Sequence, residues 1–234
     1  MARVIAALLR HGEYHQLPDT PSALQPFPLT ATGEQQAERS VSLIQGTLKM
    51  FDWSLYPVID SSRLLRGWQT AEVMRQGMQI GSRQKMGIES FDALAERSLG
   101  SAANLTLKQV ESILHDDPRF TPPPTGWKSD SYYRLPLQGA ESLMEAGERV
   151  AEHLERRLVE LQSRVAVDSV KLFVGHGAAF RHAAYHLGVL AFEQIAALSM
   201  YHCRPVFLER LPEGSWRHLT GEWKLRSEGD ELVD

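Results

Sequence analysis

The sequence predicts an α/β fold, a three-layer sandwich whose central sheet is mostly parallel and is covered by helices on both faces. Apolar or nearly apolar runs at residues 4–9 and 170–174 are typical of strands whose two faces are both buried. Amphipathic helical patterns separate such runs, as they do in units that build a parallel sheet. Each run ends in charged or titratable residues. Because ligands bind at the carboxyl edge of parallel sheets, we expect the functional site there.

The composition excludes several classes of protein. A chain of 234 residues can bury a substantial core, so we expect one domain over residues 1–234. The net charge of −4 gives no general attraction to nucleic acid or to an anionic membrane, and we expect neither as a partner. Cys203 is the single cysteine, which allows no disulfide within the chain. No apolar run is long enough to span a membrane, and we expect a cytoplasmic protein.

The first predicted strand is followed directly by Arg10, His11 and Gly12. In this arrangement a guanidinium precedes the histidine, and the glycine after it admits close backbone approach. Such a histidine at the carboxyl end of a strand suits nucleophilic attack on a phosphoryl group. A strand that simply ends at the surface in Arg-His is the alternative. The motifs farther along the chain decide between the two.

The next helix and strand follow the same alternation. Thr30 is expected to begin a helix, because its hydroxyl can cap the first turn and apolar residues recur behind it at helical spacing. Residues 56–60 form the second predicted strand, and a helix with Arg66 near its start follows. The N-terminus of that helix would add backbone donors to the guanidinium, which suits a phosphate.

Residues 86–138 are less regular, and a segment of this length is typical of an active-site lid or an insertion. We expect it to be ordered, since apolar and aromatic residues occur throughout it, with a helix over residues 106–115. The remaining predicted elements are a helix over 141–161, a strand over 170–174 that ends in Gly175-His176-Gly177, a further helix, and two strands over 205–211 and 215–223.

Two histidines on the helix after His176 resemble a metal-binding pair. His182 and His186 are four residues apart, a spacing that two ligands on one helix can have. No third ligand is evident in the sequence, so packing or surface exposure is the better interpretation. The sequence therefore predicts no metal site.

Short motifs recur at the predicted strand ends and helix starts through residues 3–182. They are Leu9-Arg10-His11-Gly12-Glu13, Pro28-Leu29-Thr30 with Gly33 and Gln36, Ser61-Ser62 with Arg66 and Gln69-Thr70-Ala71, Leu94 with Glu96-Arg97 and Gly100, Gly139 with Glu141-Ser142-Leu143, and Gly175-His176-Gly177. In this order and spacing they resemble the histidine phosphatase superfamily, which includes cofactor-dependent phosphoglycerate mutases and fructose-bisphosphatase-type enzymes. Each motif alone is weak evidence, whereas the whole set is specific for this superfamily.

The resemblance implies a role for each of five side chains. His11 would be the nucleophile that forms a phosphohistidine, Glu96 would donate the proton, and Arg10, Arg66 and His176 would surround the phosphoryl oxygens. A free imidazole is mostly neutral at pH 7 and is a competent nucleophile. The two guanidiniums and His176 can neutralise the charge of an in-line transfer, so we expect neither a metal nor another cofactor.

Other residues near these motifs are weaker candidates. Gly177 and Tyr14 are included as substrate-binding residues, whereas His15 and His202 are left as open candidates for the pocket wall. Glu141 is left out of the catalytic set, because it can equally cap the helix that follows it. The aromatic residues of the insertion can either shape a lid or pack its core. They are Trp127, Tyr132 and Tyr133.

The function predicted from these motifs is a metal-independent phosphomonoesterase whose substrate is a small phosphorylated metabolite. Leu17, Leu99 and Ala178 stand where the mutase pattern has Asn, Tyr and Asn, and each change removes a polar partner, which argues against the alternative of a phosphoglycerate-type mutase. A protein Ser/Thr phosphatase and a catalytically silent binding module are further alternatives, although a silent module has no need to keep all five catalytic side chains. Self-association into a homo-oligomer stays open.

Overall fold

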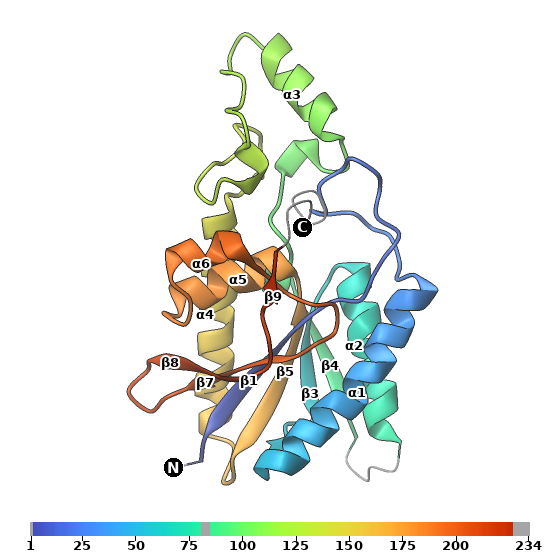
Figure 1. The fold of residues 1–234 in the computed structure, drawn as a ribbon, viewed down its shortest axis with the longest axis vertical. Coiled ribbons are helices and arrows are strands. Elements are labelled where there is room, and N and C mark those ends of the chain that lie inside the picture. The colour runs from blue at the N-terminus through green and yellow to red at the C-terminus, as the bar shows by residue number, and fades with distance from the viewer. Residues whose placement is uncertain (1, 81–84, 227–234) are drawn as a thin grey trace.

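A computed structural model describes residues 2–80 and 85–226, and within them a seven-stranded sheet forms the centre of the molecule (Figure 1). The strand order is β4-β3-β5-β1-β7-β8, and β2 also pairs with β5. Strands β1, β3, β4 and β5 are parallel, whereas β7 and β8 are antiparallel to their neighbours. The strands are β1 Val4–Arg10, β2 Ser54–Leu55, β3 Val58–Ser62, β4 Gly87–Phe91, β5 Ser169–Gly175, β7 Val206–Arg210 and β8 Trp216–Thr220.

Helices cover both faces of this sheet, which confirms the predicted α/β sandwich. Successive residues of β1 point to opposite faces: Ile5 and Leu9 pack with α1 and α2, whereas Val4 and Leu8 pack with α4 and α5. This is the reason why the whole of β1 is apolar. The helices are α1 Ala31–Phe51, α2 Leu65–Gln79, α4 Leu143–Gln162, α5 Gly177–His186 and α6 Phe192–Ala197, and a small pair of strands, β6 Leu198–Ser199 and β9 Lys224–Leu225, lies apart from the main sheet.

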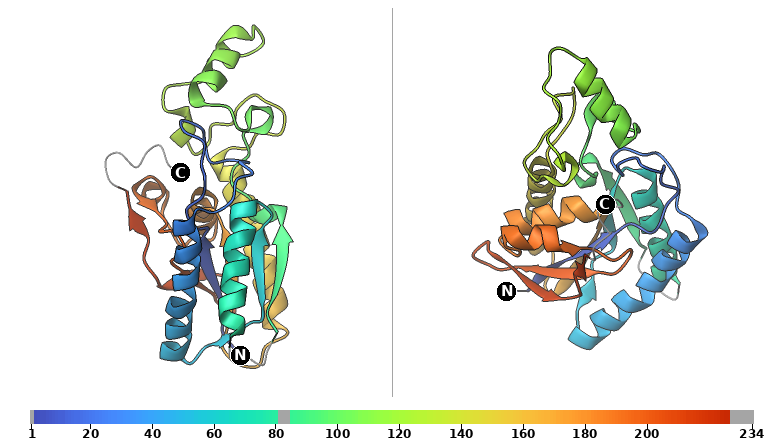
Figure 2. Two further views of the ribbon diagram at one scale, coloured as in Figure 1. Left: turned by 90° about the vertical axis from the view of Figure 1, so that its right-hand side faces the viewer. Right: turned by 45° about the horizontal axis from the view of Figure 1, so that its top comes forward.

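An insertion rises beyond the carboxyl ends of the parallel strands (Figures 1 and 2). It contains α3 Leu107–Asp116 and has a hydrophobic core of its own, in which Trp127 packs with residues of α3. Ala23, from the loop that follows β1, belongs to the same core, and the backbone N–H of Leu107 donates to the carbonyl of Asp19. The insertion is therefore ordered, and it packs against the loop between His11 and Thr30.

The structure differs from the expectations in the extent of the sheet and in the residue that caps α4. The segment 86–138 was expected to lie outside the sheet, but Gly87–Phe91 forms β4 beside β3. This strand lies at the sheet edge and is only half-buried, so it lacks the apolar run by which the other strands are recognised. Glu141 does not cap the next helix, because Ser142 accepts from the Glu145 backbone N–H and forms a capping box with it.

The other predicted elements are confirmed within a few residues. Thr30 caps α1 by accepting from the backbone N–H of Gly33, and Thr106 caps α3. In the part of the chain that the structure describes, every helix is too short or too polar to cross a membrane.

Candidate active site

The carboxyl ends of three adjacent strands, β3, β5 and β1, meet at the edge of the sheet that faces the insertion. His11 follows β1, His176 follows β5, and Arg66 lies in the first turn of α2, after β3. The backbone N–H of His11 donates to the Gly175 carbonyl at 3.0 Å, which continues the strand pairing past Arg10. The rings of the two histidines lie 5.0 Å apart. The sequence motifs thus come together as parallel sheet topology requires.

The imidazole of His11 is held in one tautomer. Its Nδ1 lies 2.8 Å from the Gly12 carbonyl, which can only accept, so Nδ1 carries the proton. Its Nε2 lies 3.2 Å from Nε of Arg66, which can only donate, so Nε2 presents a lone pair. Burial first, and then the positive charge of Arg66, holds the pKa of His11 well below 6.5. At neutral pH His11 is therefore an uncharged base with Nε2 free of a proton.

Arg66 connects both histidines to the loop after β1. It is completely buried, and its Nη1 and Nη2 donate to the carbonyls of Gln25, Ser22 and Ala23 at 2.8 to 2.9 Å. Its Nη2 also lies 3.3 Å from Nδ1 of His176. Two of its N–H groups therefore point at His11 and His176, in the place where phosphoryl oxygens would arrive.

His176 takes the opposite tautomer. Because its Nδ1 faces a guanidinium donor, its Nε2 carries the proton and donates to Oγ of Ser62 at 2.9 Å. Burial, followed by the charges of Arg66 and Arg10, keeps the pKa of His176 well below 6.5. In the free site His176 is neutral. The positive charge of the unliganded site therefore comes from the guanidiniums, and the role of His176 toward phosphoryl oxygens stays a prediction.

Arg10 lies between the two strand ends and the C-terminal segment. It is 9% exposed, and its Nη1 donates to the Met200 carbonyl at 3.2 Å. Gly177 leaves room for it, since a Cβ there would lie 3.2 Å from Cδ of Arg10. Gly177 is also the first residue of α5, so it stands at a helix N-terminus beside His176.

Glu96 lies in the loop between β4 and the insertion. It is 8% exposed, and its Oε1 accepts from the backbone N–H of Arg97 at 2.9 Å. Arg149 of α4 holds this loop in place: its Nη1 donates to three loop carbonyls while its other nitrogens bind both carboxylate oxygens of Glu141. Glu141 of the Gly-Glu-Ser motif therefore acts through Arg149 on the loop that carries Glu96. No motif in the sequence marks Arg149, which is one of several arginines on an amphipathic helix.

Tyr14 and His202 lie against His11, whereas His15 is exposed. The Tyr14 ring stands edge-on to the imidazole with its centroid 5.4 Å away, and the Arg66 guanidinium lies 4.5 Å from the centroid of the same Tyr14 ring. Nδ1 of His202 donates to the His11 carbonyl at 2.6 Å. Tyr14 and the open candidate His202 therefore contact the nucleophile, whereas the open candidate His15 is exposed.

Several motif residues support the site from behind. Oγ1 of Thr70 accepts from the backbone N–H of Gly12 at 3.0 Å. A Cβ on Gly12 would lie 2.5 Å from the carbonyl oxygen of Gly33, so the loop and the start of α1 approach more closely than any larger residue allows. Oε1 of Gln36 accepts from the backbone N–H of Glu13. These residues fix the backbone next to His11.

The two histidines on α5 differ in burial, since His182 is buried and His186 is exposed. Nδ1 of His182 donates to the Ala178 carbonyl and its Nε2 accepts from Oγ of Ser131, while Nε2 of His186 donates to the Met144 carbonyl. Across residues 2–80 and 85–226, no three His, Cys, Asp or Glu side chains gather as metal ligands would.

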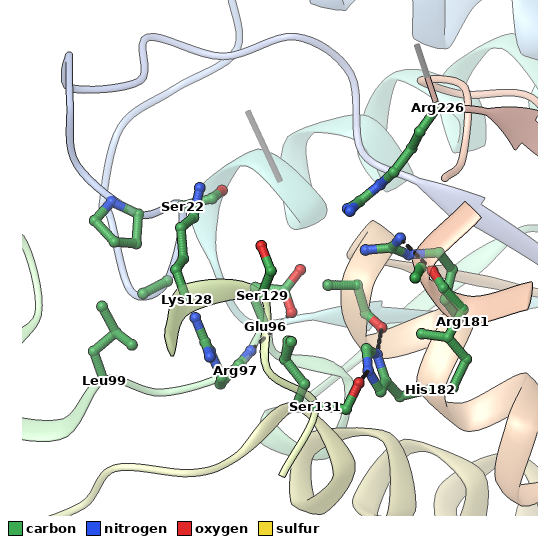
Figure 3. Close-up of a pocket in the computed structure, with 16 residues that line it drawn as sticks. Ser22, Glu96, Arg97, Leu99, Lys128, Ser129, Ser131, Arg181, His182 and Arg226 are labelled. Carbon is green, nitrogen blue, oxygen red and sulfur yellow. Dashed lines mark hydrogen bonds between the residues drawn. The ribbon is translucent and has the colours of Figure 1, made fainter. Parts of the chain in front are cut away.

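A pocket of about 630 Å³, measured with its open mouth, lies between the insertion, the loop after β1 and the start of α5 (Figure 3). Glu96 is one of its lining residues, and so are Ser22 and Ala23, whose carbonyls bind Arg66. Sequence reasoning missed three cationic residues of the wall, because they come from separate segments and follow no motif. They are Lys128, Arg181 and Arg226.

Comparison with known proteins identifies the family. The model of the histidine phosphatase superfamily (branch 1) matches residues 6–220. No curated protein matches the sequence.

Solved structures share the fold over almost the whole chain. One is "Mycobacterial hydrolase 2", with 19% identity and a TM-score of 0.70 over 99% of this chain and 96% of that one. Another is mycobacterial glucosyl-3-phosphoglycerate phosphatase, with 18% identity and a TM-score of 0.67 over 93% of this chain and 96% of that one. A putative alpha-ribazole-5'-P phosphatase from Escherichia coli is similar at 16% identity, with a TM-score of 0.63 and coverage of 100% and 99%. At these identities the likeness shows the fold.

Proposed function

This chain belongs to the histidine phosphatase superfamily (branch 1) and is an enzyme of the phosphatase type, and we propose that it hydrolyses small phosphorylated metabolites through a phosphohistidine on His11. One observation carries the proposal: Nε2 of a buried, neutral His11 presents its lone pair beside the guanidinium of Arg66. A nucleophile and an anion-binding donor thus face the same space.

The reaction follows from these positions in two steps. Nε2 of His11 attacks phosphorus, a P–N bond forms, and the P–O bond to the leaving alcohol breaks while Glu96 gives that oxygen a proton. Glu96, now a carboxylate, takes a proton from water, whose oxygen attacks the phosphohistidine. The P–N bond breaks, inorganic phosphate leaves, and His11 returns to its neutral form. Arg10 and Arg66 stabilise the charge on the transferred oxygens in both steps.

Two features support a small substrate. The pocket is a concave space whose wall combines apolar and polar side chains, as small-molecule sites do. The insertion rises beyond the carboxyl ends of the parallel strands (Figure 2), and Lys128 and Ser129 from it line the pocket. Among the solved relatives, one is named glucosyl-3-phosphoglycerate phosphatase, and another is a phosphoserine phosphatase from Entamoeba histolytica in complex with 3-phosphoglyceric acid.

The walls of the pocket favour hydrolysis over a mutase reaction. Leu99 and Ala178, which stand where the mutase pattern has Tyr and Asn, both line it. A mutase must hold its phosphorylated intermediate while that intermediate changes orientation. Against an apolar wall the polar groups of the intermediate have no hydrogen-bond partners, which costs about 1–3 kcal/mol for each group.

Measurement of phosphate release from a panel of phosphomonoesters tests the proposal, with His11→Ala as the comparison. We expect the variant to lose at least about a thousandfold in kcat, as happens when a residue of a catalytic unit is removed. Phosphate trapped on the wild type during turnover should be labile to acid and stable to base. An acid-stable label, or efficient isomerisation of 3-phosphoglycerate without phosphate release, would contradict it.

A further inference from the structure

Tyr14 is a buried tyrosine that contacts both the nucleophile and the arginine facing it. The residue is 7% exposed. Its ring stands edge-on to the His11 imidazole, with an angle of 83° between the two ring planes. Cζ of Arg66 lies over the same Tyr14 ring, 4.5 Å from its centroid. One rigid side chain therefore touches both groups that the proposed reaction brings to phosphorus.

Arg66 is a fully buried cation whose hydrogen-bond partners are neutral. In the described part of the chain they are His11, His176 and three backbone carbonyls of the loop after β1. A buried charge loses its hydration, and burial is the chief cause that lowers the pKa of Arg66. The negatively polarised face of an aromatic ring attracts a cation, most strongly where water is excluded. The Tyr14 ring supplies this contact.

The hydroxyl of Tyr14 holds the loop whose carbonyls face Arg66. Burial raises the pKa of Tyr14 above its usual value of 10, so the phenol is neutral at pH 7. Its Oη is hydrogen-bonded to Oγ of Ser22 at 2.8 Å, and the carbonyl of Ser22 accepts from Nη2 of Arg66 at 2.9 Å. Ser22 also belongs to the wall of the pocket (Figure 3). Tyr14 thus acts on Arg66 directly through its ring and indirectly through Ser22.

The backbone of Tyr14 is tied to the helix that carries Arg66. Tyr14 forms an antiparallel bridge with Leu29, and the backbone N–H of Leu29 donates to Oε1 of Gln69 at 2.9 Å. Gln69 follows Arg66 on α2. The ring is therefore held at a fixed place relative to α2, and its contact with the guanidinium is formed before a ligand arrives. A donor that is already in position loses little conformational entropy on binding.

We propose that Tyr14 is a positioning residue that acts through Arg66. Its ring, and the hydrogen bond of its hydroxyl to Ser22, hold the guanidinium where its N–H groups meet the phosphoryl oxygens. The inference rests on the proposed function, in which Arg66 binds those oxygens. Tyr14 serves the substrate without touching it, since its hydroxyl is engaged by Ser22. Loss of the ring should therefore weaken the binding of any phosphoryl group, whatever the leaving alcohol is.

Two variants of Tyr14 test this inference, with p-nitrophenyl phosphate and inorganic phosphate as probes. Tyr14→Leu removes the ring, and we expect kcat/KM to fall about tenfold and Ki for phosphate to rise by a similar factor. Tyr14→Phe keeps the ring over Arg66 and should stay within about threefold of the wild type on both measures. In Tyr14→Leu, aryl and alkyl phosphates should slow equally, because proton donation to the leaving group is not the step that changes.

Tyr56 offers a matched control. Its ring also faces a cation, Nζ of Lys171, at 5.1 Å from the ring centroid. It precedes β3, so it lies at the opposite end of that strand from the site. Tyr56→Leu should leave both kcat/KM and Ki for phosphate unchanged.

A double-mutant cycle tests the link through the serine. Tyr14→Phe and Ser22→Ala each remove the same hydrogen bond, and Ser22→Ala keeps the backbone carbonyl that binds Arg66. The double variant should therefore lose no more activity than the weaker of the two single variants. Losses that add would mean that the two hydroxyls act separately.

Each outcome supports or overturns the inference. A wild-type Ki for phosphate in Tyr14→Leu overturns it, and so does a loss in Tyr14→Phe or Tyr56→Leu as large as that in Tyr14→Leu. If thermal unfolding shows that Tyr14→Leu does not fold, the double-mutant cycle decides, and additive losses overturn the inference. If the wild type hydrolyses no phosphomonoester, the proposed function fails, and calorimetric titration of inorganic phosphate into the wild type and Tyr14→Leu decides. Equal affinities, or no binding by either protein, then overturn the inference, whereas weaker binding by Tyr14→Leu supports it.

Discussion

Single atoms decide the chemistry of His11. Nδ1 donates to the Gly12 carbonyl, and the lone pair of Nε2 faces Arg66. The same guanidinium faces Nδ1 of His176, so one buried arginine sets the tautomers of both histidines. His202 adds a third constraint, because it donates to the carbonyl of His11 itself. The nucleophile is thus oriented through its ring and through its backbone.

We predict that His202 positions His11, and the prediction can be tested at this one residue. His202→Ala removes the donor to the His11 carbonyl, which corresponds to about 1 kcal/mol and therefore about a fivefold loss in kcat. His202→Asn keeps a side-chain N–H donor and should recover part of that loss, with KM changed less than kcat in both variants. Steady-state kinetics of the two variants measures this. Equal losses in Ala and Asn variants would assign His202 a packing role only.

At the scale of elements, the loop after β4 and the helix α4 act together. Arg149 on α4 donates to three carbonyls of that loop and pairs with Glu141. The capping box at Ser142 fixes the start of the same helix. The proposed acid, Glu96, is therefore positioned by a helix from the other end of the insertion.

We predict that Arg149→Gln weakens proton donation more than phosphate binding. Without Arg149 the loop that carries Glu96 loses three hydrogen bonds to α4, so the carboxyl is held less firmly. Alkyl phosphates, whose leaving group needs a proton, should slow by about tenfold, whereas aryl phosphates should slow much less. Rates for the two substrate types in Arg149→Gln and in Arg164→Gln, an exposed arginine just beyond α4, provide the measurement. An equal slowing of both types would contradict this role.

At the scale of the whole molecule, folding buries several histidines in neutral form. His11, His176 and His182 all have pKa values below 6.5, each chiefly because of burial. The unfolded chain would bind protons on them more readily than the folded chain does. A group of this kind contributes stability that is present above its unfolded pKa and is lost as the pH falls below it.

We therefore predict that the free energy of unfolding decreases as the pH is lowered from 7 to 5. Between pH 6.5 and the lowered folded pKa values, each histidine contributes about 1.4 kcal/mol per pH unit. The carboxylates of Asp60 and Glu209, whose pKa values are also lowered, act in the same direction at lower pH. Denaturant titrations at several pH values measure the slope, and His182→Asn should reduce it. A stability that is constant from pH 7 to pH 5 would argue against buried neutral histidines.

The sequence by itself determined the elements and the centre of the site. The apolar run of β1 and the cap at Thr30 are local signals, so they can be read without knowledge of distant contacts. His11, Arg66 and His176 stand at strand ends or helix starts, and parallel topology brings such positions to one edge.

Only the tertiary structure decided the rest. It placed Gly87–Phe91 in the sheet, because an edge strand half-exposed to water carries no continuous apolar run. It showed His176 to be neutral, since burial and neighbouring guanidiniums set its charge. It also brought Arg97, Lys128 and Arg181 around one pocket. These residues are far apart in the chain and share no period, so their meeting depends on how the insertion packs over α5 and the loop after β1, which no local pattern encodes.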